Sequence, residues 1–148
     1  MTPGINNRNP KRLGYLGDTD FFSELVCAHL KMIGNIQVDH TTSCDELLKR
    51  LSSIDLLVVE EGVRDCNLDE LLTVLKLRSA ETPCIILSSN VTSESKLRLL
   101  QLGANDVIAR DEFTCEVLEV QIRRAMESLT LSDQLNAARK RLEGVSIS

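Results

Sequence analysis

Short apolar runs alternate with amphipathic segments along most of the chain. The runs are typical of buried strands, and the segments between them repeat apolar residues at helical spacing. The pattern predicts strands at residues 12–17, 36–41, 54–59, 83–88 and 106–109, and helices at 20–33, 43–51, 68–78, 93–102 and from about residue 111. Strands separated by helices of this length require crossover connections. The sequence therefore predicts an α/β fold: a doubly wound (βα)5 parallel five-stranded sheet with an extended C-terminal helix.

The third predicted strand ends in an acidic pair. Residues 54–59 form a nearly unbroken β-prone run, and Glu60, Glu61 and Gly62 follow directly. Open α/β sheets carry their sites at the carboxyl ends of their strands. Neighbouring strand residues point to opposite faces, so Glu61 is expected to begin the loop and face solvent. Glu60 alone is compatible with a nucleophile, a metal ligand or a general base.

Composition narrows the class of protein. The chain has 148 residues, which suits one domain, and 43% hydrophobic with 26% charged residues is typical of a soluble globular protein. The net charge of −5 argues against direct nucleic-acid binding, which needs a basic surface. No apolar run is long enough to span a membrane, and Met1 to Lys11 lack the apolar core of a signal peptide. We therefore expect a cytoplasmic protein without membrane contact.

Other chemistry-bearing residues form no recognisable motif. The five cysteines are scattered without paired metal spacing, and we interpret them as reduced, mostly buried thiols: Cys27, Cys44, Cys66, Cys84 and Cys115. His29 and His40 are isolated. Gly14 and Gly17 lack the further glycine of a phosphate-binding loop, which argues against a nucleotide- or flavin-binding domain.

Three segments together resemble the receiver domain of bacterial two-component response regulators. They are residues 55–60, 83–89 and 103–110, and the resemblance covers about residues 11–128. It implies a flavodoxin-like fold and a role in phosphorelay signal transduction. In that family a phosphoryl group is transferred to an aspartate, helped by Mg²⁺ on adjacent acidic residues, a hydroxyl residue and a lysine.

Position by position, much of the family's pattern is altered in this chain. Glu60 stands at the phospho-acceptor position, and Ser88 matches the hydroxyl residue. Arg110 replaces the lysine. The acidic pair after the first strand is reduced to Gly17 and Asp18, so only Asp18 matches a metal ligand.

Two further departures concern the switch itself. Val107 stands where the family has the aromatic ring that reports phosphorylation. Asp111 replaces the proline that usually follows the lysine, which puts the family's cis peptide in doubt, because cis bonds are essentially confined to proline.

These changes argue against phosphorylation. A glutamate places its oxygen roughly 1 Å further out than an aspartate, and a misplacement of about 1 Å can cost about a hundredfold in rate. Loss of one carboxylate weakens a Mg²⁺ site, which needs a near-ideal octahedron of oxygen ligands. Asp18 and Glu60, with Glu61, are only a weak candidate for a metal site, and we expect no cofactor.

Three interpretations remain open at this point. Glu60 could pair with Arg110 and extend toward Ser88, holding the domain in one signalling state, since the guanidinium fork suits a bidentate bond to carboxylate. The site could instead have drifted while the fold persisted as an interaction scaffold. The alternative is a phospho-accepting receiver with an atypical site that uses Mg²⁺. We expect a non-enzymatic pseudo-receiver that acts through protein–protein interaction or dimerisation.

The last helix carries a second apolar stripe. Leu118, Ile122, Ala125 and Leu129 form the first stripe, and the second repeats the four-three-four spacing at Leu131, Leu135, Ala138 and Leu142. The step from Leu129 to Leu131 turns the apolar face by roughly 200°. The second stripe therefore suits a coiled coil with a homodimer partner or a following output or kinase domain. A hairpin back onto the domain or a frayed tail are the alternatives.

This pattern predicts three parts of the chain. Residues 1–11 are expected to be a flexible N-terminal segment, residues 12–128 the receiver-like domain, and residues 129–148 a helical extension. Residues 144–148 are interpreted as a linker, in which case the chain is a piece of a longer protein.

Overall fold

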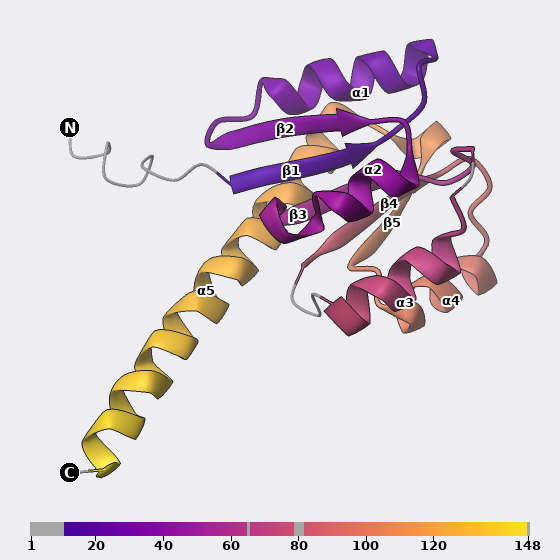
Figure 1. Cartoon of the computed structure of the whole chain (residues 1–148). Helices are drawn as coiled ribbons and strands as arrows, with labels where there is room; N and C mark the ends of the chain where they lie inside the picture. Colours follow the sequence, from indigo (N-terminus) through magenta and orange to yellow (C-terminus); the bar gives the residue numbers. More distant parts are fainter. Residues whose placement is uncertain (1–10, 65, 79–81, 148) are drawn as a thin grey trace.

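Five parallel strands form one sheet in the order β2-β1-β3-β4-β5. The computed structural model describes residues 11–64, 66–78 and 82–147. The expected flexible segment at residues 1–11 lies outside this part of the chain, apart from Lys11, which begins the first strand. The predicted doubly wound α/β fold is confirmed (Figure 1).

Strands and helices alternate throughout, as predicted. The strands are β1 (Lys11–Leu16), β2 (Ile36–Thr41), β3 (Leu56–Glu60), β4 (Cys84–Ser88) and β5 (Asp106–Ala109). The helices are α1 (Phe21–Lys31), α2 (Cys44–Lys49), α3 (Leu68–Arg78), α4 (Ser93–Leu102) and α5 (Cys115–Ile147), with 3-10 turns η2 (Leu51–Ser53) and η3 (Arg110–Glu112).

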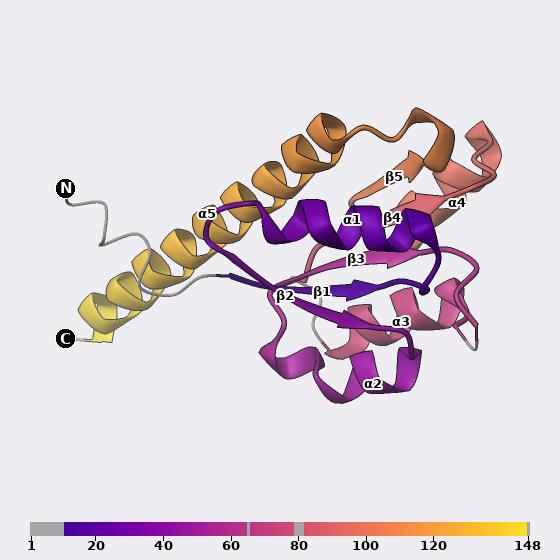
Figure 2. The same ribbon diagram turned by 90° about the horizontal axis from the view of Figure 1, so that it is seen from above.

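Two apolar cores cover the two faces of the sheet. α1 and α5 pack on one face, and α2, α3 and α4 pack on the other. Figure 2 shows α1 on the opposite side of the sheet from α2 and α3. All five residues of β3 are buried because this strand lies at the centre of the sheet. Its successive side chains therefore enter the two cores alternately, with Val58 on the α1 side and Val59 on the α2 side.

The ends of the chain's last elements differ from expectation. The last helix begins at Cys115 because η3 follows β5 and Phe113 leaves the helical conformation at its end. At its other end α5 continues to Ile147, so residues 144–147, which were interpreted as a linker, are helical. The described peptide bonds are all trans, including those around Asp111.

α5 has a packed half and a projecting half. Leu118, Ile122 and Ala125 are buried against the sheet. Beyond them the helix leaves the body of the domain (Figures 1 and 2), and Lys11 Nζ lies 3.7 Å from Asp133 Oδ2 near the point of departure. The described residues include no helix that is both long and apolar enough to cross a membrane.

Candidate functional site

Glu60 ends β3 as a buried acid with 4% of its surface exposed. Its side chain points to the same face of β3 as those of Leu56 and Val58, so it enters the core beneath α1. Tyr15 of β1 and Ser23 of α1 lie in the same core and are both 0% exposed. The site is therefore built from the ends of two neighbouring strands and the first turn of α1.

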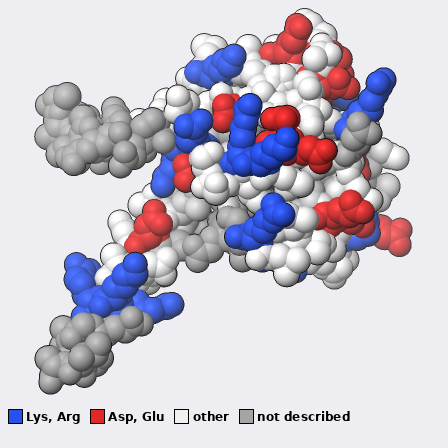
Figure 3. All heavy atoms as spheres, in the orientation of Figure 1, with Lys and Arg blue, Asp and Glu red and all other residues white. Residues whose placement is uncertain are grey.

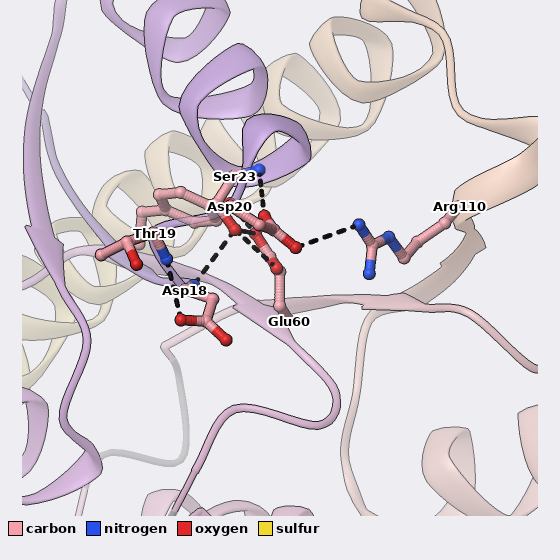
Figure 4. Close-up of polar contacts among 7 residues, drawn as sticks. Asp18, Thr19, Asp20, Ser23, Glu60 and Arg110 are labelled. Carbon is pink, nitrogen blue, oxygen red and sulfur yellow. Dashed lines mark hydrogen bonds and ion pairs between the residues drawn. The ribbon is translucent and has the colours of Figure 1, made fainter.

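Hydroxyl groups from within the domain hold the Glu60 carboxylate. The Tyr15 hydroxyl donates a short hydrogen bond to Oε2. Ser23 Oγ lies 2.9 Å from both carboxylate oxygens and accepts a 3.1 Å hydrogen bond from the Asp18 amide (Figure 4). Ser23 thus links the loop after β1 to Glu60. Each of these partners comes from the protein, so the carboxylate is satisfied without an external ligand.

The absence of a side chain at Gly17 makes room for this arrangement. A Cβ atom at Gly17 would lie 2.5 Å from Tyr15 Cζ and 2.8 Å from Glu60 Oε2. The Tyr15 ring also stacks on His40, with ring centroids 5.0 Å apart. Tyr15 therefore occupies the space beside Glu60 that any larger residue at position 17 would need.

Burial favours the neutral form of Glu60. Loss of hydration raises the pKa of its carboxyl group above the ordinary value, while the charge of Arg110 and a hydrogen bond from the Asp18 backbone act in the opposite direction. The Tyr15 and Ser23 hydroxyls can bond either protonation state, because a hydroxyl both donates and accepts. The site is consequently suited to retaining an acid in the core.

Arg110 pairs with Asp20, whereas a pair with Glu60 was one of the interpretations left open by the sequence. Arg110 Nη2 lies 3.6 Å from Asp20 Oδ2 (Figure 4). The guanidinium carbon of Arg110 lies 3.9 Å from the centre of the Phe22 ring. Asp20 is the N-cap of α1, and its carboxylate accepts a hydrogen bond from the Ser23 amide. This hydrogen bond is the main reason why the pKa of the Asp20 carboxyl group is lowered. An exposed, ionised Asp20 is a better partner for a guanidinium than a buried, internally bonded Glu60.

Ser88 does not contact Glu60 either. It ends β4 at 1% exposure, and its hydroxyl donates a short hydrogen bond to Glu61 Oε1. It also accepts a 3.3 Å hydrogen bond from the Asn90 amide. Glu61 is exposed, as predicted, and lies just beyond the strand. The two acids after β3 therefore have separate sets of partners.

The side chain of Asp18 is exposed, and only the Asp18 backbone takes part in the buried network. Its Oδ1 accepts a 2.8 Å hydrogen bond from the amide of Thr19. Across the part of the chain that the structure describes, no three His, Cys, Asp or Glu side chains are grouped so that they could hold a metal ion. The geometry thus adds no support to the weak metal candidate of Asp18 and Glu60.

The sequence reasoning missed three residues of this site. These residues are Tyr15, Asp20 and Ser23, none of which was a candidate site residue. Ser23 had a usable signal, because it shares the buried face of α1 with Val26 and Leu30. A polar group on a buried helix face needs a partner inside the protein.

Known structures resemble the chain, whereas sequence comparisons do not identify a family. The chain matches no protein-family model, and no curated protein matches it. The receiver domain of the Francisella response regulator 1452 is 21% identical with a TM-score of 0.69, covering 80% of this chain and 98% of that one. A response regulator receiver domain protein from Clostridium thermocellum is 16% identical with a TM-score of 0.72, covering 82% and 98%.

A longer protein matches in the same way. NtrX from Brucella abortus is 21% identical with a TM-score of 0.75 over 90% of this chain and 30% of that protein. At these identities the similarity concerns the fold. The chain therefore has the flavodoxin-like fold of response-regulator receiver domains.

Proposed function

We propose that this chain is a pseudo-receiver: a signalling domain that accepts no phosphoryl group at Glu60 and acts in signal transduction through protein–protein contacts. The burial of Glu60 beneath Tyr15 and Ser23 carries the proposal. An acceptor must meet a phosphoryl donor in line with its attacking oxygen. Here both carboxylate oxygens already bond hydroxyl groups of the protein.

The charges around the site support the same conclusion. A transferring phosphoryl group needs cations near its oxygens. Arg110 lies over Phe22 and pairs with Asp20, and Asp18 is the only carboxylate retained from the family's acidic pair. The receiver fold then serves as a scaffold for a protein partner or an output or kinase domain.

Phosphoryl transfer from a small donor tests this proposal. The full chain is incubated with acetyl phosphate and Mg²⁺, and its intact mass is measured beside that of Glu60→Gln. We expect no change in either mass. A gain of one phosphoryl group by the wild type that Glu60→Gln lacks would establish the alternative, a phospho-accepting receiver that uses Mg²⁺. A gain by both proteins would place the acceptor at another residue.

We also propose that the projecting half of α5 pairs with α5 of a second copy. Leu131, Leu135 and Leu142 are 60%, 66% and 70% exposed, although their spacing places them on one stripe with Ala138. That four-three-four repeat is the a/d seam of a two-stranded coiled coil. Most of the stability of a helix in a protein comes from packing of its apolar face, so a partner along the seam would stabilise this half of α5.

Light scattering on full-length variants tests the pairing. We expect the wild type to show twice the chain mass and Leu135→Gln/Leu142→Gln to be monomeric. Leu77→Gln is the matched control, because Leu77 is an 82% exposed leucine on α3, and it should remain a dimer. A monomeric wild type, or a double variant that still dimerises, would refute the seam.

A further inference from the structure

The apolar seam on the projecting half of α5 is made of side chains of unequal size. Leu131, Leu135 and Leu142 are large and exposed, whereas Ala138 is small and half-buried. Three positions of the seam thus project a leucine, and the fourth leaves a gap. How two such seams fit together depends on the directions in which the two helices run.

Parallel pairing fits this seam poorly. Two helices that run in the same direction and in register place each seam residue beside its own copy. Ala138 would therefore face Ala138 of the other copy. A layer of two alanines between layers of leucines leaves a void, and voids forfeit the contacts that stabilise a packed core.

Antiparallel pairing fills the gap. A two-fold axis between residues 136 and 137 lies equally far from positions 131 and 142, and equally far from positions 135 and 138. Leu131 then faces Leu142 of the other copy, and Leu135 faces Ala138. Each layer contains at least one leucine, and the small residue is always opposed by a large one. Such alternation lets the side chains of facing helices interdigitate.

The charges on this half of α5 favour the same direction. Arg139, Lys140 and Arg141 are exposed, and Figure 3 shows basic side chains gathered near the end of the helix. A parallel pair would bring the two basic clusters to the same level, where they repel. In an antiparallel pair they are about 10 Å apart along the axis, which is about one Debye length at 0.1 M salt. Each cluster then lies level with the exposed Asp133 of the other copy.

A hollow adjoins the seam where α5 leaves the domain. It has a volume of about 510 Å³, and its lining includes Met126, Glu127 and Leu131. In an antiparallel pair, Arg141 and Leu142 of the other copy reach this level and meet both apolar and acidic groups. In a parallel pair the hollow would face only the same hollow of the other copy.

We propose that two copies pair through α5 in opposite directions, with the two-fold axis between residues 136 and 137. This inference rests on the proposed pairing of α5 and adds its direction and register. The two receiver-like domains then stand at opposite ends of the paired helices. The distal end of each α5 lies beside Leu131 of the other copy.

Disulfide mapping of full-length variants tests the direction. Leu131→Cys and Leu142→Cys chains are mixed, allowed to exchange subunits and oxidised with copper phenanthroline. Trypsin places the two introduced cysteines in residues 125–139 and 142–148, which contain no native cysteine. We expect these two peptides to be linked in the mixture.

Each variant alone should give no link between identical positions. In an antiparallel pair, identical positions at 131 or at 142 are roughly 16 Å apart along the axis, whereas a disulfide needs Cα atoms within about 7 Å. Asn136→Cys is the matched control, because it is exposed at the level of the axis but lies on the side of α5 away from the seam. It should form no link.

Small-angle X-ray scattering of the wild type tests the same arrangement without a substitution. Antiparallel pairing separates the two domains by roughly 45 Å along the axis, so we expect two maxima in the pair-distance distribution. Parallel pairing would place the domains side by side and give one.

The outcomes separate the direction of pairing from the pairing itself. A wild type that is monomeric by light scattering would refute both. A dimer with a single maximum, or with links between identical positions, would overturn the antiparallel direction and leave the pairing intact. A dimeric mixture without the link between positions 131 and 142 would overturn the register.

Discussion

The Glu60 site and the projecting half of α5 are opposite in which side chains they bury. At the end of β3 a carboxylate is buried and bonded by hydroxyls of Tyr15 and Ser23. Along α5, leucines that could be buried stand in solvent, with Leu142 70% exposed. In the proposed function, the position that matches the phospho-acceptor of receiver domains is buried, and exposed apolar surface lies elsewhere on the domain.

This contrast indicates where the chain has capacity to bind. A satisfied, buried network gains little from a ligand, because the ligand would have to replace bonds that already exist. Exposed apolar area gains free energy whenever a partner covers it. Figure 3 adds a group of basic side chains near the end of α5, where Arg139, Lys140 and Arg141 lie beside the apolar seam. Recognition is therefore concentrated on α5 in this account.

The largest loss of stability should follow a change at Gly17. Gly17→Ala places a methyl group within 3 Å of the Tyr15 ring and the Glu60 carboxylate, so we expect it to lower the free energy of unfolding by about 1–3 kcal/mol. Gly34→Ala is the matched control, because nothing lies within 4 Å of a Cβ there, and should change it by less than about 0.5 kcal/mol. Equal effects in urea denaturation would show that Gly17 is not constrained by the site.

Removal of the Tyr15 hydroxyl should have the next largest effect. Tyr15→Phe keeps the ring but leaves Glu60 Oε2 without that donor, and loss of one partner of a buried polar group costs about 1–2 kcal/mol. Ser53→Ala removes an exposed hydroxyl bond to the Arg50 carbonyl and serves as the control. A Tyr15→Phe protein as stable as the wild type in thermal unfolding would contradict the proposed network.

Titration of Glu60 should give a smaller, pH-dependent effect. Because its folded-state pKa is raised above 4.5, the folded chain binds this proton more tightly than the unfolded chain. Stability from this group is therefore complete below pH 4.5 and falls as pH rises toward the folded-state pKa. Glu60→Gln removes the titrating carboxyl group. As pH rises from 4.5 toward the folded-state pKa of Glu60, the wild type should therefore lose stability relative to this variant.

Denaturant unfolding at a series of pH values measures this difference. Glu127→Gln, at an exposed position of α5, controls for the change of side chain. A wild type that gains stability relative to Glu60→Gln as pH rises would mean that the carboxylate is better stabilised in the folded chain than in water.

The α5 seam should contribute least to the folding of a single chain. Leu135→Gln/Leu142→Gln should change the unfolding free energy of the monomer by less than about 0.5 kcal/mol, since both leucines are already exposed. The measurement is made at concentrations at which light scattering detects only monomer. A loss above about 1 kcal/mol would indicate that the seam folds back on its own domain.

Much of the fold was predictable because its signals are local. Residues 36–41, 68–78, 93–102 and 106–109 were assigned with their observed bounds. Apolar periodicity and end signals such as Gly103, which adopts a φ of +119° after α4, fix such elements within a few residues of sequence. The delayed start of α5 escaped because a 3-10 turn has no comparable periodic pattern.

The site was only partly predictable because its partners are set in three dimensions. The placement of Glu60 at the end of a buried strand followed from the sequence, whereas the burial of Glu60 itself did not. Arg110 pairs with Asp20 and not with Glu60 because Asp20 caps α1 near the guanidinium. The contact of Tyr15 with Glu60 depends on the parallel pairing of β1 with β3. Neither distance is encoded in local spacing.

Fluorine NMR with beryllofluoride, a phosphoryl analogue, tests the closure of Glu60 most directly. The full chain is titrated with beryllofluoride and Mg²⁺, with Glu60→Gln as the control. Because the carboxylate is buried and bonded by Tyr15 and Ser23, we predict no bound fluorine resonance in either protein. A bound resonance in the wild type that Glu60→Gln abolishes would contradict the account.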